Sequence, residues 1–105
     1  MSEFVFMALY RPKPGKENEL IEILKVHIPV LREEGLITER DLLTLKAEDG
    51  TIIEIAEWKS SEAIDRAHHS EKVMAVWDQI ASVAELTNLS SLAEAQHPFP
   101  NFKAI

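Results

Sequence analysis

The sequence predicts an α+β fold in which one antiparallel sheet carries helices on one of its faces. Residues 37–47 and 51–58 are rich in aliphatic and β-branched residues, and they flank Glu48-Asp49-Gly50, which is typical of a hairpin turn. Apolar residues recur at helical spacing in two other stretches, 16–34 and 70–84. A chain of 105 residues without cysteine is expected to form a single domain, residues 1–105, whose core needs no disulfide.

The first half of the chain predicts a strand, a helix and a hairpin. Residues 4–10 are apolar at every position, which predicts a strand that is buried on both faces. A turn rich in proline and glycine follows, and the helical pattern begins at Lys16. Gly35 is expected to end that helix in a left-handed conformation. The hairpin strands come next.

The second half predicts two helices and a terminal strand. Ser60 is expected to cap a short helix that reaches about Ala67, and Ser70 to cap a longer one. The longer helix presents an apolar face that is expected to extend to Ala84. Two prolines hold residues 96–105 extended, and a short strand is expected after Pro100.

The resulting βαββαβ order is that of a ferredoxin-like sheet, with its helices on one face. The other face of such a sheet is bare. Because the strands are apolar on both faces, a monomer would expose more apolar surface than soluble monomers tolerate. We therefore expect a homodimer formed by packing of two sheets.

Composition excludes several classes of partner. The net charge is −7 and no cluster of Lys or Arg forms a stripe for phosphates, so nucleic acid is not an expected partner. The longest apolar run is far shorter than the ~20 residues of a membrane-spanning helix, so no membrane partner is expected. The first residues lack the pattern of a secretory signal, which together with the absence of cysteine predicts a cytoplasmic protein.

The motif W-K-S-S-E-A-I at 58–64, followed by His68, resembles the antibiotic biosynthesis monooxygenase (ABM) family. The resemblance implies a dimeric α+β barrel with a small-molecule pocket between sheet and helices. In members that oxidise phenols to quinones, an Asn, a Tyr and an Arg accompany the strand-end Trp. Here only Trp58 matches, because the other aligned positions hold Glu54, Ile64 and, approximately, Asp78.

The resemblance also bears on cofactors. In haem-degrading members, a Trp distorts the porphyrin and a His ligates iron, and the aligned positions here are Ala67 and Trp77. The neighbours His68 and His69 would diverge by about 100° on a helix, so they form no ready pair of metal ligands. No glycine pattern for a nucleotide cofactor is present. We expect neither a metal nor a cofactor.

Two residues are candidates for a general base. Glu54 shares a strand face with Trp58, so it could be a carboxylate in an apolar crevice that accepts a proton. It could instead lie at the rim of the crevice or be paired with Lys or Arg. His68 could contact a ligand or could bond only to a backbone carbonyl. The other candidates for substrate binding are Trp58, His27, Tyr10 and Trp77, although a buried structural role explains His27 and Tyr10 equally well.

These observations predict a cofactor-independent enzyme, similar to a monooxygenase, that acts on a small aromatic or enolisable molecule. The alternative is a noncatalytic dimeric module that binds a small molecule. A polar group that converges on an apolar pocket would favour the enzyme, and a pocket filled by the chain's own aromatic side chains would favour the module.

Overall fold

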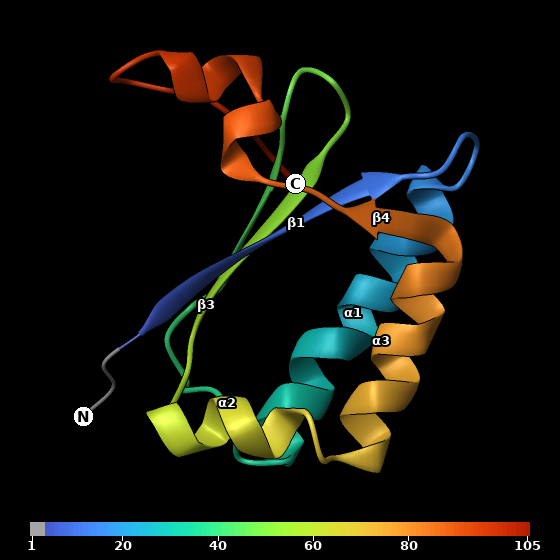
Figure 1. Cartoon of the computed structure of the whole chain (residues 1–105), viewed down its shortest axis with the longest axis vertical. Helices are drawn as coiled ribbons and strands as arrows, with labels where there is room; N and C mark the ends of the chain where they lie inside the picture. Colours follow the sequence, from blue (N-terminus) through green and yellow to red (C-terminus); the bar gives the residue numbers. More distant parts are fainter. Residues whose placement is uncertain (1–3) are drawn as a thin grey trace.

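The computed structural model describes residues 4–105 and consists of one antiparallel sheet with helices packed against one face, as Figure 1 shows. This architecture confirms the predicted α+β class. In chain order the elements are β1 (Val5–Pro12), α1 (Glu17–Glu33), β2 (Leu43–Lys46), β3 (Ile52–Glu57), α2 (Ser61–Ala67), α3 (Glu71–Val83), β4 (Ala84–Leu86), the short 3-10 helices η1 (Leu89–Ser91) and η2 (Ala93–Gln96), and β5 (Lys103–Ala104).

The sheet has five strands in the order β4-β1-β3-β2-β5. The long central pair, β1 and β3, is antiparallel and in register from Val5 opposite Glu57 to Tyr10 opposite Ile52. The first four strands with their intervening helices follow the predicted ferredoxin-like βαββαβ order. The fifth strand adds a second edge beside β2.

The predicted strand over 37–47 is wrong in length. Only β2 pairs continuously with β3, and Ile37 keeps a single isolated bridge to Trp58. Between these points the Arg40 backbone N–H donates to Thr38 Oγ1 over 3.2 Å. Because a threonine hydroxyl offers the backbone an alternative to the ladder, the chain leaves the sheet here and rejoins it at β2.

The last strand of the βαββαβ order was expected in the tail, and this expectation is wrong. That strand is β4, which follows α3 directly, so Ala84 is the first residue of a strand rather than part of the helix. Ala84 is buried in β4, and three residues are too few to show a period of two. The short strand expected after Pro100 is present as β5, which is an addition to this order.

The predicted helix starts at Ser60 and Ser70 and the predicted end of the first helix at Gly35 are confirmed. Ser60 Oγ accepts from the Ala63 N–H over 3.2 Å, and Ser70 Oγ caps α3 in the same way. Gly35 follows α1 with φ +72°, in the left-handed region where a side chain is disfavoured. The two serine caps fix the α2–α3 corner, which carries His68.

The helix-covered face of the sheet holds most of the core. Residues from β1, β3 and all three helices form two adjoining apolar clusters there, which include Leu20, Leu31, Ile52, Ala56, Ala63, Val73 and Ile80. In Figure 1, α1 and α3 lie side by side and α2 crosses near the end of β3. The pocket described below lies in this layer.

The opposite face of the sheet is only partly covered. Figure 1 shows the C-terminal segment beyond β4 on the far side of the sheet from the helices, and its Leu92 packs there with Leu9 and Ile53. Nothing in residues 4–105 covers the remainder of this face, where Met7 and Leu43 are exposed. The first strand was predicted to be buried on both faces. In one chain this is true only of part of the strand, since Leu9 is buried on this face and Met7 is exposed.

Candidate functional site

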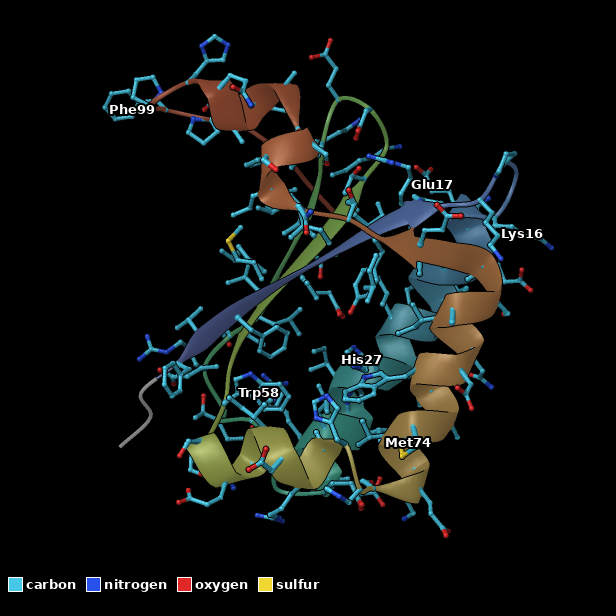
Figure 2. The ribbon with its side chains drawn as sticks, viewed as in Figure 1. Lys16, Glu17, His27, Trp58, Met74 and Phe99 are labelled. Atoms are coloured by element: carbon cyan, nitrogen blue, oxygen red, sulfur yellow. The ribbon has the colours of Figure 1, made fainter. Side chains whose placement is uncertain are left out.

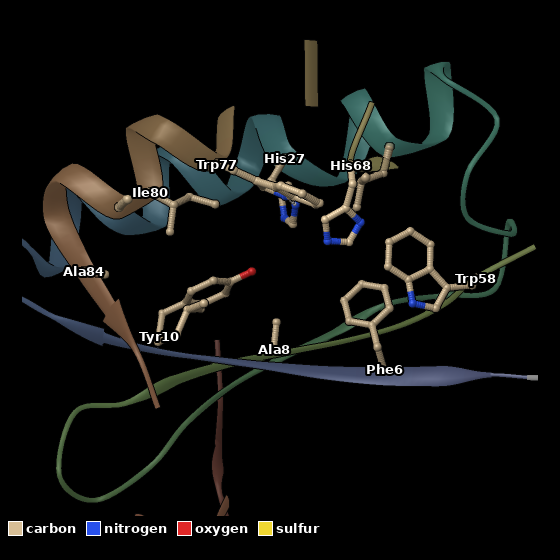
Figure 3. A pocket seen from close by; sticks show the side chains of 12 residues that line it. Phe6, Ala8, Tyr10, His27, Trp58, His68, Trp77, Ile80 and Ala84 are labelled. Atoms are coloured by element: carbon tan, nitrogen blue, oxygen red, sulfur yellow. Dashed lines mark hydrogen bonds between the residues drawn. The ribbon is translucent and has the colours of Figure 1, made fainter. Parts of the chain in front are cut away.

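A pocket of about 470 Å³ lies between β1 and the three helices, as Figure 3 shows. Strand alternation turns every second side chain of β1 toward it, and α1, α3 and the α2–α3 corner supply the opposite wall. The lining residues are mostly apolar or aromatic: Phe6, Ala8, Tyr10, His27, Leu31, Trp58, His68, Trp77, Ile80, Ala81, Ala84 and Leu86.

Five of the six residues singled out in the sequence line this pocket, namely Tyr10, His27, Trp58, His68 and Trp77. Figure 2 shows His27 on α1 and Trp58, directly after β3, pointing into the space between the layers. Glu54 is the exception. It is 1% exposed, is not among the lining residues, and bonds to two residues that are.

Glu54 is the centre of a buried hydrogen-bond network that joins four elements. Its Oε1 atom accepts from the Tyr10 hydroxyl over 2.7 Å and lies 3.0 Å from His27 Nδ1. The Trp77 indole N–H donates to His27 Nε2 over 3.0 Å. The network therefore connects β1, β3, α1 and α3 around one carboxylate.

The donors and acceptors fix the tautomer of His27. An indole N–H can only donate, so His27 Nε2 must be an acceptor without a proton. The ring proton is then on Nδ1, which donates to Glu54. If both ring nitrogens carried protons, the His27 Nε2–H would face the Trp77 N–H, and neither group could accept a hydrogen bond. The contact between His27 and Glu54 is thus a hydrogen bond that a neutral imidazole donates to the carboxylate, rather than a salt bridge.

Tyr10 is held in its protonated form. Burial raises the pKa of the Tyr10 phenol far above its ordinary value, and the negative charge of Glu54 and the hydrogen bond to it raise the pKa further. The phenol therefore remains a donor to Glu54 and is not itself a base at neutral pH.

His68 has a free nitrogen at the pocket. Its Nδ1 lies 2.8 Å from the Ile64 carbonyl oxygen, which can only accept, so Nδ1 carries the proton. In the neutral ring the Nε2 lone pair remains, and it has no hydrogen-bond partner in residues 4–105. The ring packs edge-on against Trp77, with centroids 5.1 Å apart. The neighbouring His69 bonds in the same way to the Asp65 carbonyl but does not line the pocket.

Trp58 and Phe6 form the wall at the end of the pocket away from Tyr10 (Figure 3). Their ring centroids are 4.9 Å apart. Phe6 was not singled out in the sequence, nor was Ala8, although both alternate with Tyr10 along β1 and could have been found by that spacing. Leu86 was missed because β4 was not predicted.

The described residues hold no group of three His, Asp or Glu side chains that could bind a metal ion. At the two positions that align with haem-binding residues, Ala67 is buried and apolar, and the Trp77 N–H is bonded to His27. Neither side chain can ligate iron. Among residues 4–105, no helix combines the length and the apolar character needed to cross a membrane.

The fold and the pocket define a small α+β protein with an apolar cavity between its sheet and helices. The family model described as antibiotic biosynthesis monooxygenase (ABM) matches residues 3–79, and the chain belongs to this family. The family includes monooxygenases and noncatalytic members. No curated protein and no solved structure matches the chain.

The raised pKa of Tyr10 predicts a loss of stability at alkaline pH. The unfolded chain releases this proton near pH 10 and the folded chain keeps it, so above pH 10 the unfolded state binds fewer protons. The stability from Tyr10 is complete below that pH. It then falls by about 1.4 kcal/mol per pH unit. Urea unfolding at several alkaline pH values measures how steeply the free energy of unfolding falls with pH. In Tyr10→Phe this slope should be smaller by about 1.4 kcal/mol per pH unit.

Tyr10 is the single tyrosine of the chain, so the absorbance of tyrosinate reports on it alone. That absorbance should rise only as the protein unfolds. Ordinary titration of Tyr10 near pH 10 in the folded protein would contradict its burial beside Glu54.

Proposed function

We propose that the protein binds a small, uncharged aromatic or enolisable molecule in the apolar pocket and removes an acidic proton from it without a cofactor. The observation that carries the proposal is the lone pair of His68 Nε2. His68 is an exposed residue that lines the apolar pocket, and its Nδ1 is bonded to the Ile64 carbonyl. A neutral imidazole with one fixed proton and one open nitrogen is suited to general-base catalysis near neutral pH.

Between the two predicted bases, the geometry favours His68 over Glu54. A base must come within hydrogen-bond reach of the proton that it removes. Glu54 is 1% exposed and is not a lining residue, and its Oε1 already accepts two hydrogen bonds. We assign to Glu54 the positioning of Tyr10 and His27, and to Trp58 the stacking of the substrate.

The proposed reaction uses molecular oxygen as the co-reactant. His68 takes a proton from an activated CH2 group, and the carbanion transfers two electrons to O₂ as a C–O bond forms. The protonated His68 then returns its proton to the peroxide oxygen. The resulting hydroperoxide loses its second hydrogen from carbon as the O–O bond breaks, giving a C=O group and water. Overall, CH2 and O₂ become C=O and H2O, so the balance requires no external reductant.

The alternative is noncatalytic binding, and a specific observation favours it. The polar groups of Tyr10, His27 and Trp77 are already bonded within the protein. If His68 only orients a ligand, the pocket is a receptor and not a catalytic site.

The test uses anthrone, a three-ring ketone with an acidic CH2 group, and follows oxygen uptake and anthraquinone formation above the uncatalysed rate. His68→Gln keeps a polar side chain but removes the basic nitrogen, so turnover should fall by roughly 10² to 10⁴. His69→Gln is the matched control and should retain the wild-type rate, because His69 lies outside the pocket.

Equal rates for the wild type and His68→Gln would exclude His68 as the base. If anthrone binds but the wild-type protein does not accelerate its oxidation, the noncatalytic alternative gains support.

We further propose that two chains associate through the uncovered part of the sheet. Met7, Ile55 and Leu43 lie opposite one another on β1, β3 and β2 and form an apolar row across that face. Met7 is 40% exposed and Leu43 is 56% exposed. A row of this kind, next to the patch covered by the C-terminal segment, is suited to a second copy of the same sheet.

Sedimentation at micromolar concentration should therefore give twice 11.9 kDa. Met7→Lys should produce monomers, because it places a charge in the proposed interface. Met74→Lys is the control, since Met74 is 46% exposed on α3 in the helix layer (Figure 2). A wild-type protein that sediments as a monomer, or a Met7→Lys variant that stays dimeric, would contradict this interface.

A further inference from the structure

We infer that the part of the pocket lined by the buried Tyr10 and His27 and by the exposed His68 selects ligands that donate a hydrogen bond and carry no negative charge. A neutral phenol or enol meets both conditions, whereas a carboxylate of the same shape meets neither. This inference concerns the pocket of the proposed function and rests on it only for the location of the ligand. It does not require that the ligand reacts.

The first step is that the donors in this part of the pocket are already used. The Tyr10 O–H and the His27 Nδ1–H both point to Glu54, and the Trp77 N–H points to His27. A ligand that needs a hydrogen bond from one of these groups would have to break a buried contact. The free energy lost by leaving a buried partner without a hydrogen bond exceeds the free energy gained from the new bond.

The second step is that acceptors remain. His68 Nε2 has an open lone pair, and the Tyr10 oxygen, which donates its single proton to Glu54, still has lone-pair capacity. Both residues line the pocket, as Figure 3 shows. The indole N–H of Trp58 has no partner in residues 4–105, but Trp58 lies at the other end of the pocket, beside Phe6. The part of the pocket lined by Tyr10 and His68 therefore offers acceptors to a ligand.

The third step is electrostatic. The buried negative charge of Glu54 lies one hydrogen bond behind the lining residue Tyr10. His27 is neutral, so it does not cancel that charge, and the described lining residues include no Lys or Arg. Because charges interact more strongly in an apolar site than in water, an anionic ligand would be repelled and would also lose its hydration.

The test compares three ligands with one naphthalene skeleton by isothermal titration calorimetry at neutral pH. They are 2-naphthol, which is neutral and donates, 2-methoxynaphthalene, which is neutral and cannot donate, and 2-naphthoate, which is an anion. We expect 2-naphthol to bind about 3- to 10-fold more tightly than the methyl ether. It should bind roughly 30-fold or more tightly than 2-naphthoate.

Glu54→Gln separates charge from hydrogen bonding. It removes the buried charge and keeps the size of the side chain, so the preference for 2-naphthol over 2-naphthoate should shrink at least about threefold. Glu62→Gln makes the same change in net charge on the exposed surface of α2 and should leave the preference unchanged. If Glu54→Gln does not fold, the wild-type series still decides the question.

Equal affinity for 2-naphthol and 2-naphthoate would overturn the charge selection, and equal affinity for 2-naphthol and its methyl ether would overturn the selection of donors. In either case, a loss of anthrone oxidation in His68→Gln would leave the proposed function standing. If none of the three ligands binds, both the inference and the proposed ligand pocket fail.

Discussion

The carboxylate of Glu54 is the constraint on which the rest of the site depends. A buried charge is costly unless hydrogen bonds stabilise it, and here Tyr10 and His27 both donate to one oxygen. Hydrogen bonds to a charged group contribute about 1.5 to 3 kcal/mol each. To supply these donors, β1 must lie beside β3, and α1 must present His27 to the same point. Trp77 on α3 then fixes the tautomer of His27.

This network separates structural polar groups from those that can meet a ligand. The protons of Tyr10, His27 and Trp77 are directed inward, so these side chains present apolar rings and lone pairs to the pocket. The nitrogen of His68 that can accept a proton is held outside the network, at the α2–α3 corner. The serine caps of α2 and α3 hold this corner, and they do not involve Glu54. The position of His68 therefore does not depend on the buried network.

Much of the fold could be predicted from local physical rules. Gly35 marks the end of α1 because a left-handed residue favours glycine, and Ser60 and Ser70 mark helix starts because their hydroxyls satisfy free backbone N–H groups. The rules failed where tertiary contacts decide. The Thr38 hydroxyl bonds to the Arg40 N–H and takes the chain out of the predicted strand, and β4 is too short to show alternation.

The sequence predicted which residues lie at the site better than it predicted the contacts between them. Alternation along β3 places Glu54 and Trp58 on one face, but it does not reveal that Glu54 is enclosed by Tyr10 and His27. Those contacts join residues 44 and 27 positions apart in the chain, which no local pattern records. The sequence also left open which nitrogen of each histidine carries the proton, because partners in other elements or one turn away determine it.

The most direct measurement is the protonation of the ring nitrogens of His27 and His68, observed in a long-range proton–nitrogen NMR spectrum of the folded protein. The contacts predict a neutral His27 with its proton on Nδ1 at neutral pH. In its neutral form, His68 should likewise carry its proton on Nδ1. A proton on Nε2 of His27 would contradict the network, because Trp77 and His27 would then both be donors at their contact.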